Sequence, residues 1–382
     1  MEREEWNRLT YKIFSELEKE WFEDSSSRGR TRVLSIDGGG LKALISGQAL
    51  VYLEQAIQTK TSDPKARIAD FFDVIAGTGM GGIFASMLLA DDGRGRPLYT
   101  AKEAVELMIQ NSHRMFKKKI FRRRFSGKSF DEALREILSR DGRALTLKDM
   151  LKPLLIPCYD LESGAPFLFS RADAVESDSF DFQLWSVCRA TTATPGLFKP
   201  VSLSSFDGKT LCTAVDGGLV MNNPTAAAVT HVMNNRREFP MVRRVEDLLV
   251  LSLGNATFRG QCSYGEMQQW SGRDCSTDAV QVAIDGISDT VDQMLNNAFC
   301  GARQNYVRIQ ATALPSDLEP KINRSMTDNV KVMIQAGEQM LKEKCMEIEP
   351  FPFGGKKLAP QTNLLRLDTF INKIIDTGKQ LT

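Results

Sequence analysis

The segment 74-VIAGTGMGGIFAS-86 contains an apolar run, a glycine-rich turn and a second apolar run with helical spacing. This order predicts a strand that turns sharply into a helix. Esterases place a nucleophilic serine at the centre of such a turn, in the pattern G-x-S-x-G. Here the turn reads 77-GTGMG-81, so Gly79 takes the central position. The turn has the form of a nucleophile elbow without its nucleophile.

A second glycine turn, 37-DGGGLKA-43, follows a strand predicted at residues 32–36 and opens a helix predicted at 41–57. Glycines allow positive φ angles and let a ligand approach the backbone N–H groups closely. The helix N-terminus adds a partial positive charge. These features predict a cradle for an anion or oxyanion. A plain strand–helix turn, or a dinucleotide loop with Ala43 in place of its last glycine, is the alternative interpretation.

A third turn, 214-AVDGGLVMNNP-224, places Asp216 at the end of an apolar strand and before two glycines. A carboxylate at such a strand end is well placed to act as a general base. For an aspartate that stands alone in such a turn, the commoner role is that of a turn or helix-capping residue.

The three turns occur in one order: DGGG, then the elbow, then DGG-x(4)-NP. In this order the sequence resembles patatin-like lipid acyl hydrolases, from about residue 30 to 310. Two further segments fit the resemblance, 71-FFDVIAGTGMGG-82 and 189-RATTATPGLFKP-200. The resemblance implies a three-layer α/β/α sandwich with a mainly parallel central sheet, and a Ser–Asp dyad that uses no histidine. The chain has only His113 and His231, and neither lies in a motif.

The resemblance also implies roles for individual residues. Asp216 corresponds to the base, Lys42 to a basic, substrate-binding position, and Gly79 to the nucleophile. The oxyanion hole corresponds to Gly38, Gly39 and Gly40, with Met80 after the elbow centre.

Gly79 has no side chain, so no acyl-enzyme can form at this position. Met80 replaces a small polar residue usual in the family and makes the floor of the site more apolar. The G-x-G-x-G elbow also resembles one plant subgroup of patatin-related proteins. Ser86, seven residues along the helix, and Thr78 are the neighbouring hydroxyls, and we expect neither to replace the missing serine.

Three functions are consistent with these residues. The first is weak, broad hydrolysis of phospholipid or galactolipid esters, with Asp216 activating a water in the space that a serine side chain would fill. The second is a catalytically silent protein that binds lipid or acyl groups. The third, a nucleotide-binding protein, rests on DGGG alone and leaves Asp216 unexplained.

The composition is ordinary for a globular protein, with 42% hydrophobic and 25% charged residues and a net charge of +1. No overall charge favours nucleic acid. Seven scattered cysteines, with no C-x-x-C spacing, predict free thiols in a reducing compartment. The sequence shows no metal-ligand spacing and implies no cofactor. With neither a signal peptide nor an apolar span, we expect a cytoplasmic protein, peripheral on membranes at most.

Further strands are predicted at 153–160, 166–170, 211–215, 247–253 and 304–310, with helices between them. We expect three units: an N-terminal helix and linker at 1–30, a patatin-like domain at 31–311, and a helical C-terminal extension at 312–382 that packs on it. In that extension the pattern predicts two helices, joined by a loop over 349–360.

The segment 113-HRMFKKKIFRRRFSGK-128 forms a local basic run with interleaved phenylalanines. It is a candidate surface for docking on an anionic membrane. A solvated helix face packed by its phenylalanines, or a nuclear-import-like run, are the alternatives. The candidate membrane contacts are Lys117, Lys118, Lys119, Arg122, Arg123 and Arg124.

Overall fold

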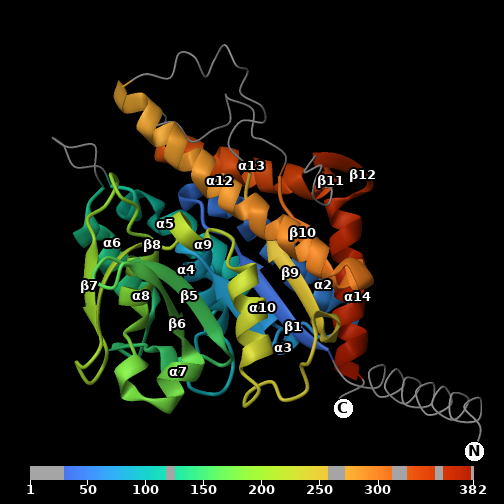
Figure 1. Ribbon diagram of the computed structural model, residues 1–382, viewed down its shortest axis with the longest axis horizontal. Coiled ribbons are helices and arrows are strands. Elements are labelled where there is room, and N and C mark those ends of the chain that lie inside the picture. The colour runs from blue at the N-terminus through green and yellow to red at the C-terminus, as the bar shows by residue number, and fades with distance from the viewer. Residues whose placement is uncertain (1–29, 118–124, 257–271, 312–324, 349–355, 380–382) are drawn as a thin grey trace, which may run out of the picture.

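A central sheet lies between two layers of helices (Figure 1). The computed structural model describes residues 30–117, 125–256, 272–311, 325–348 and 356–379. The sheet has eight strands in the order β10-β9-β1-β2-β5-β8-β7, and β6 also pairs with β5. Strands β10 through β5 run parallel, whereas β6, β7 and β8 join in antiparallel pairs. The predicted α/β/α architecture with a mainly parallel sheet is confirmed.

The predicted strands are all present. They are β1 (Thr31–Ile36), β2 (Val74–Gly77), β5 (Leu154–Asp160), β6 (Ala165–Ser170), β8 (Leu211–Asp216), β9 (Leu248–Leu253) and β10 (Tyr306–Ile309). The sequence did not predict two elements: the short strand β7 (Val201–Ser204) and the small β3–β4 hairpin (Ser139–Arg140, Arg143–Ala144). The main helices are α2 (Ala43–Thr61), α4 (Gly79–Leu89), α5 (Ala101–Met115), α6 (Gly127–Ile137), α8 (Leu184–Thr191), α10 (Thr225–Asn234) and α12 (Gly272–Ala298).

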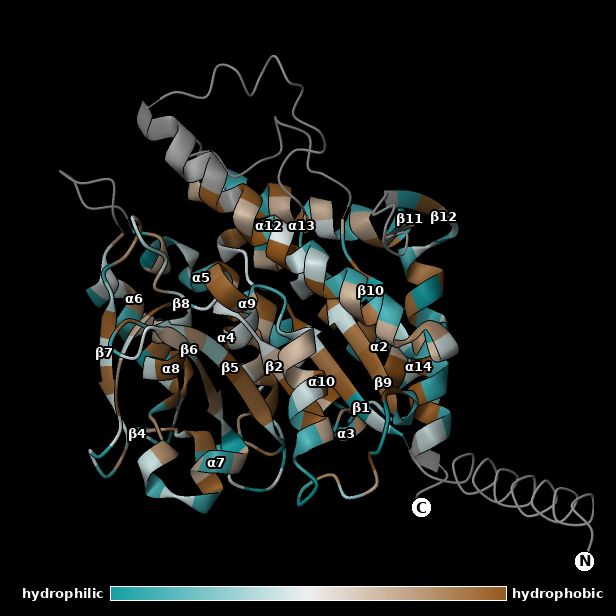
Figure 2. Ribbon diagram, viewed as in Figure 1, coloured by the Kyte–Doolittle hydropathy of each residue, from teal (hydrophilic) through white to brown (hydrophobic). Residues whose placement is uncertain are grey.

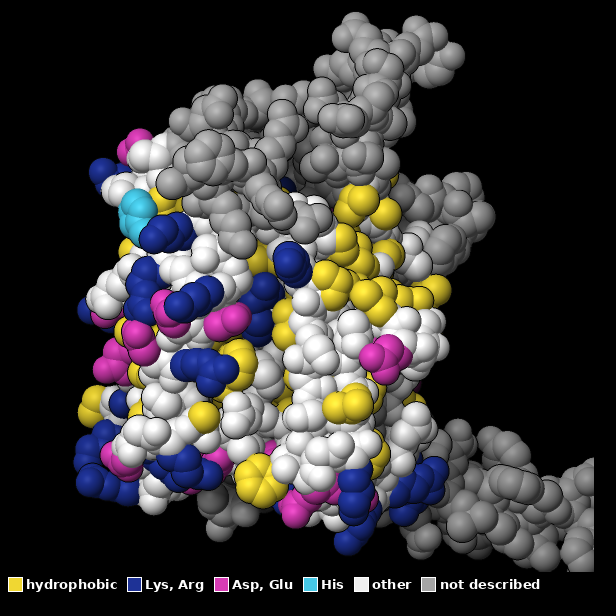
Figure 3. Space-filling model, turned by 90° about the vertical axis from the view of Figure 1, so that its left-hand side faces the viewer, with side chains coloured by type: hydrophobic (Ala, Val, Ile, Leu, Met, Phe, Trp, Pro, Cys, Tyr) yellow, Lys and Arg dark blue, Asp and Glu magenta, His cyan; other side chains and the backbone are white. Residues whose placement is uncertain are grey.

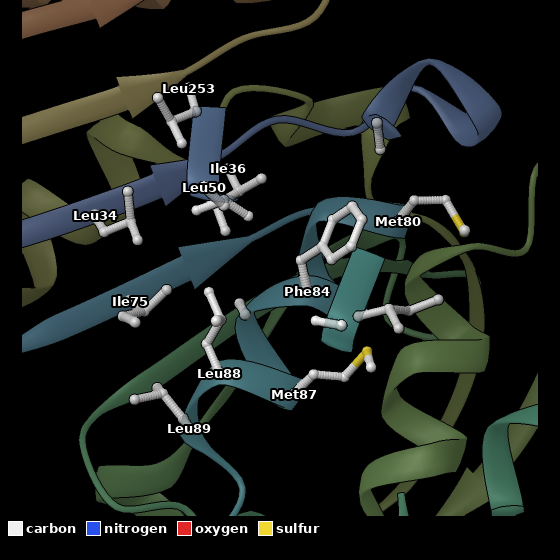
Figure 4. Close-up of a cluster of buried hydrophobic side chains, with 14 of the residues drawn as sticks. Leu34, Ile36, Leu50, Ile75, Met80, Phe84, Met87, Leu88, Leu89 and Leu253 are labelled. Carbon is white, nitrogen blue, oxygen red and sulfur yellow. The ribbon is translucent and has the colours of Figure 1, made fainter. Parts of the chain in front are cut away.

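The central strands are apolar on both faces, as buried parallel strands should be. In β1, Val33 belongs to one buried cluster, which includes α10 and the end of α12, whereas Leu34 belongs to the larger cluster beneath α2 and α4. Figure 2 shows the hydrophobic colour of these strands, and Figure 4 shows the larger cluster, where Leu34, Ile36 and Ile75 meet Leu50 and Phe84.

The C-terminal segment packs on α2. It contains α13 (Met326–Lys342) and α14 (Asn363–Lys379), and Phe370 of α14 stacks on Phe72 with ring centroids 6.4 Å apart. The prediction of helices alone here was wrong, because β11 (Lys344–Ile348) and β12 (Lys356–Thr362) form an antiparallel hairpin between them. A two-stranded hairpin tolerates Pro360, since an edge strand does not need every N–H. The division into units at residues 30 and 311 stays a prediction, and the predicted N-terminal helix lies outside the described residues.

One edge of β5 brings two distant strand ends together. Near its start, β5 pairs with β2 (Ile75 opposite Leu154), and further along it pairs with β8 (Cys158 opposite Asp216). Strand β6 occupies the other edge. Because β2 and β8 approach each other along one edge from opposite directions, the residues after Gly77 meet Asp216. Pro157 lies between the two paired stretches, and its lack of an N–H leaves no buried donor in that gap.

The turn after β2 also requires glycine at two places. A Cβ atom at position 77 would lie 2.4 Å from the carbonyl oxygen of Gly81. A Cβ at position 81 would lie 2.5 Å from the carbonyl oxygens of both Ile36 and Asp37. These glycines let α4 begin against the end of β1, as the sequence predicted for the elbow.

We predict that Gly81→Ala lowers the free energy of unfolding by about 3 kcal/mol, because backbone must move to admit the methyl group. Gly286→Ala in α12 is the matched control, since no atom lies within 4 Å of its Cβ position. There alanine should stabilise the protein by about 0.5–1 kcal/mol through helix propensity. Chemical denaturation measures both, and equal effects would contradict the packing argument.

Candidate active site

Gly79 lies where β2 ends and α4 begins, with a φ of 54°. This left-handed conformation is natural for glycine and strained for a residue with a side chain. The Gly79 N–H donates to Oγ1 of Thr191 (2.9 Å), and that hydroxyl donates to the Pro157 carbonyl (2.6 Å). The Thr191 hydroxyl therefore connects the elbow to Pro157, which lies on β5 between the stretches that pair with β2 and β8.

The side-chain position at Gly79 is open. A Cβ atom there would lie 3.7 Å from Gly38 Cα, 3.7 Å from the Thr191 carbonyl oxygen and 4.0 Å from Oδ1 of Asp216. These are ordinary van der Waals separations. A small side chain would fit, and it would lie beside the carboxylate and the DGGG loop.

Asp216 is the last residue of β8 and is partly buried. Its Oδ1 accepts a hydrogen bond from the Gly218 N–H (2.8 Å), and its Oδ2 accepts one from the Thr194 hydroxyl. Burial raises the pKa of Asp216 above its ordinary value, and the two hydrogen bonds act in the opposite direction. A carboxylate with a raised pKa is a stronger base.

The DGGG loop is held from both sides. Gly38 N–H donates to the Asn222 carbonyl (2.9 Å), and the Gly38 carbonyl accepts from Nδ2 of Asn255 (2.6 Å). Since C=O and N–H point in opposite directions across a trans peptide, this second bond turns the Gly39 N–H away from Asn255. Among the described residues, the N–H groups of Gly39 and Gly40 have no acceptor. They are therefore available to a bound oxyanion.

Asp37, the first residue of the loop, forms a buried ion pair with Arg308 of β10. The guanidinium makes two hydrogen bonds to the carboxylate, at 2.6 and 3.2 Å, and a third to Ser252 (2.7 Å). Burial alone lowers the pKa of Arg308, but the carboxylates of Asp37 and Asp292 outweigh it and raise the pKa overall. The pair fixes the start of the glycine loop against β9 and β10.

A cavity of about 190 Å³ lies over these groups. The loop residues Gly38–Gly40, Asp216 and Lys42 line it, together with Ile284, Asp285 and Ser288 of α12. Gly79 is not part of the lining, but its side-chain position adjoins Asp216 and Gly38, which are. The structure thus brings together the residues predicted as base, oxyanion loop and vacant nucleophile.

Met80 lies elsewhere than the sequence implied. Its side chain is buried and lines a second, apolar cavity of only about 10 Å³, with Phe84, Met108 and Phe116 (Figure 4 shows Met80 and Phe84). Gly40 lines both cavities. The Met80 N–H, in the first turn of α4, has no acceptor among the described residues. It can join the glycine-loop amides as a donor.

Neither neighbouring hydroxyl can act as the nucleophile. Ser86 is fully buried and donates to the Gly82 carbonyl (2.8 Å). Thr78 is also buried, and its hydroxyl donates to the Met221 carbonyl (2.5 Å).

The basic segment is described only in part. Lys117 is exposed, while Lys118, Lys119, Arg122, Arg123 and Arg124 lie outside the described residues. The flanking Phe116 and Phe125 pack edge to face, 5.6 Å between centroids, and Phe125 also contacts Phe198. These two phenylalanines are half-buried and pack against the hydrophobic core, and the predicted membrane contacts stay a prediction.

Sequence reasoning missed several residues of the site. Thr194 lies inside 189-RATTATPGLFKP-200, a segment already singled out for its family resemblance, so its hydroxyl could have been proposed. Arg308 carried no local signal, since it pairs with a residue 271 positions away. Asn255 follows an ordinary buried strand. Among the described residues, no group of three His, Cys, Asp or Glu side chains could hold a metal ion.

An elbow after β2, a glycine loop after β1 and an aspartate after β8 define a patatin-type site. The chain belongs to the patatin-like phospholipase family, whose model, "Patatin-like phospholipase", matches residues 34–229. Its relatives include three proteins from Arabidopsis thaliana. "Probable inactive patatin-like protein 9" is 48% identical over 98% of this chain and 94% of its own length. "Patatin-like protein 6" is 45% identical over 92% and 72%, and "Patatin-like protein 7" is 43% identical over 97% and 80%.

A solved structure, VipD from Legionella pneumophila, aligns over 82% of this chain and 67% of its own. Its TM-score is 0.33 and its identity 14%, a likeness too slight to add to the fold. Among the described residues, no helix is long and apolar enough to cross a membrane.

We predict that Arg308→Gln lowers the free energy of unfolding by about 3–5 kcal/mol, because it leaves the Asp37 carboxylate buried without its partner. Arg237→Gln is the matched control: Arg237 pairs with Glu176 on the surface, with the two side chains 83% and 56% exposed. Such a pair contributes at most about 1 kcal/mol. Urea denaturation at neutral pH compares the two, and a small effect of Arg308→Gln would show that the pair does not anchor the loop.

Proposed function

We propose that the protein is a slow acyl hydrolase of lipid esters in which a water molecule replaces the missing serine. One observation carries the proposal: the open side-chain position at Gly79 lies 4.0 Å from Asp216 and 3.7 Å from the DGGG loop. A base and a set of oxyanion donors thus surround a space of the size that a hydroxymethyl group would fill. A water occupies about that volume.

The reaction would begin with Asp216 ionised. Asp216 accepts a proton from the water as the water oxygen forms a bond to the ester carbonyl carbon. The carbonyl π electrons move to its oxygen, and the N–H groups of Gly39, Gly40 and Met80 stabilise the resulting negative charge. When the tetrahedral intermediate collapses, the bond to the alcohol oxygen breaks, and that oxygen takes the proton from Asp216. The products are a fatty acid and an alcohol.

The two cavities suggest how an ester substrate would be oriented in the site. Gly40 lines both the polar cavity and the apolar space beside Met80 and Phe84. An ester whose carbonyl lies at Gly40 would direct its acyl chain toward Met80 and its polar part toward α12. The apolar space is small, so Met80, whose thioether side chain is flexible, would have to move to admit a chain.

A second function, binding of lipid esters without turnover, has its own support. Both carboxylate oxygens of Asp216 already accept hydrogen bonds, from Gly218 and Thr194, which limits the orientation of any water at the base. A relative that is 48% identical also bears the name "Probable inactive patatin-like protein 9". Both functions use the same residues and differ in whether water attacks.

Three proteins distinguish these functions: the native chain, Asp216→Asn and Gly79→Ser. We predict slow fatty-acid release by the native chain from phosphatidylcholine and galactolipid, and none above background by Asp216→Asn. Enzymes without their serine retain about 10³–10⁴-fold catalysis over water from binding and the oxyanion hole. Gly79→Ser should be at least about 10²-fold faster than the native chain, because it restores the nucleophile.

Equal release by the native chain and Asp216→Asn would exclude the water mechanism. No release by the native chain, together with fast release by Gly79→Ser, would establish the silent binder instead. No release by any of the three would remove the hydrolase site from consideration.

The rate of Gly79→Ser should depend on pH through Asp216. The base works when ionised, so activity is complete above the folded-state pKa and is lost as pH falls through it. Because burial raises this pKa, the midpoint should lie above the ordinary aspartate value of about 3.9. A rate profile on a water-soluble ester measures it. A midpoint at or below the ordinary value would contradict the burial of the base.

A further inference from the structure

Helix α12 directs several polar side chains toward the site. Asp285 and Ser288 line the polar cavity, and Asn222 beside the glycine loop donates to the Ser288 hydroxyl (2.9 Å). One turn further, the buried Asp292 accepts a hydrogen bond from the Tyr306 hydroxyl (2.7 Å) and lies 3.9 Å from Arg308. Asp285, Ser288 and Asp292 therefore lie on the side of this helix that faces the site.

The solvent-exposed residues in the described part of α12, in contrast, carry no charge. Between residues 280 and 298, leaving residue 281 aside, seven residues are exposed, and none is charged. We call this set the α12 outer face: Val280, Val282, Ala283, Gly286, Thr290, Met294 and Ala298. Val280, Val282 and Met294 are 44%, 45% and 57% exposed. A helix on the surface of a soluble domain usually carries its charges on the outward side.

The surroundings share this character. Figure 3 shows hydrophobic side chains gathered at the upper right, in the region that α12 occupies, whereas lysine, arginine and carboxylate side chains crowd the left-hand side and the lower edge of that face. The rim of the cavity is also partly apolar, since Leu197 (39% exposed) and Ile284 line it. Single exposed apolar residues need no explanation, but an uncharged stripe that adjoins the mouth of a cavity does.

We propose that the α12 outer face rests on the surface of a lipid bilayer and brings the cavity mouth to the lipid. This proposal rests on the proposed function, because a site for lipid esters is the reason to choose a lipid bilayer as the partner of this face. Because no exposed side chain of the α12 outer face is charged, we expect this face to contact the apolar part of the bilayer surface and not its charged head groups. A partner with a charged surface would leave its own charges unpaired against this face. Docking should therefore occur on zwitterionic lipid and gain little from anionic lipid.

The experiment measures co-sedimentation of the full chain with phosphatidylcholine vesicles, with and without phosphatidylserine. Val282→Asp and Met294→Asp place a carboxylate on the α12 outer face. Phe206→Asp is the matched control, since Phe206 is 74% exposed and lies in the turn between β7 and β8. We expect each α12 variant to bind vesicles about tenfold more weakly than the native chain, and Phe206→Asp to bind as the native chain does.

The same substitutions in the Gly79→Ser protein separate this inference from the proposed function. Hydrolysis of vesicle lipid should fall with binding, while hydrolysis of a water-soluble butyrate ester should be unchanged. Vesicle binding that is unaffected by Val282→Asp and Met294→Asp, or that requires phosphatidylserine, would overturn the docking surface. So would a native dimer that Met294→Asp dissociates, because a second copy would then cover α12. Absence of hydrolysis on both substrates, by the native chain and by Gly79→Ser alike, would overturn the proposed function and leave the binding result standing.

Discussion

The site depends on one constraint of the sheet: β2 and β8 each pair with the same edge of β5. This pairing allows two strands that are far apart in sequence to end at the same place, one running into the elbow and the other delivering Asp216. Pro157 lies between them and has no N–H, and its carbonyl accepts a hydrogen bond from the Thr191 hydroxyl, so Pro157 has no unpaired backbone group in the gap. The buried Asp37–Arg308 pair then fixes the glycine loop above the gap.

This framework does not need a side chain at residue 79. Gly79 has a left-handed conformation at no cost, and the contacts that shape the site come from Gly77, Gly81, Thr191 and Asp216. Loss of a serine would therefore leave the fold and the base intact and remove only the chemistry that needs a covalent intermediate. The glycine loop and the Asp216 carboxylate, which the proposed function requires, are both retained and line the same cavity.

Much of this arrangement could be predicted from the sequence, because its parts are local. Glycines at 38–40, 77 and 81 indicate turns, and at 77 and 81 a Cβ atom would lie within 2.5 Å of a backbone carbonyl oxygen. The strands that lead into these turns are continuous apolar runs. The sequence could not place Arg308 or Asn255, since their role exists only through contacts with a loop more than 200 residues away. It also assigned the side chain of Met80 to the floor of the site, whereas α4 turns it into the apolar cavity between α4 and α5. The C-terminal hairpin was missed because the pattern there predicted two helices and the proline- and glycine-containing stretch suggested a loop between them.

The account is tested most directly by reacting the native chain and Gly79→Ser with a fluorophosphonate and mapping the product by mass spectrometry. If Asp216, the vacant position and the glycine loop form one site, the serine introduced at position 79 should be the sole labelled residue, with one group per chain. Asp216→Asn in the same background should suppress the reaction, and the native chain should stay unlabelled. A folded Gly79→Ser protein that does not react, or a label on another residue, would show that base and elbow do not act on the same point.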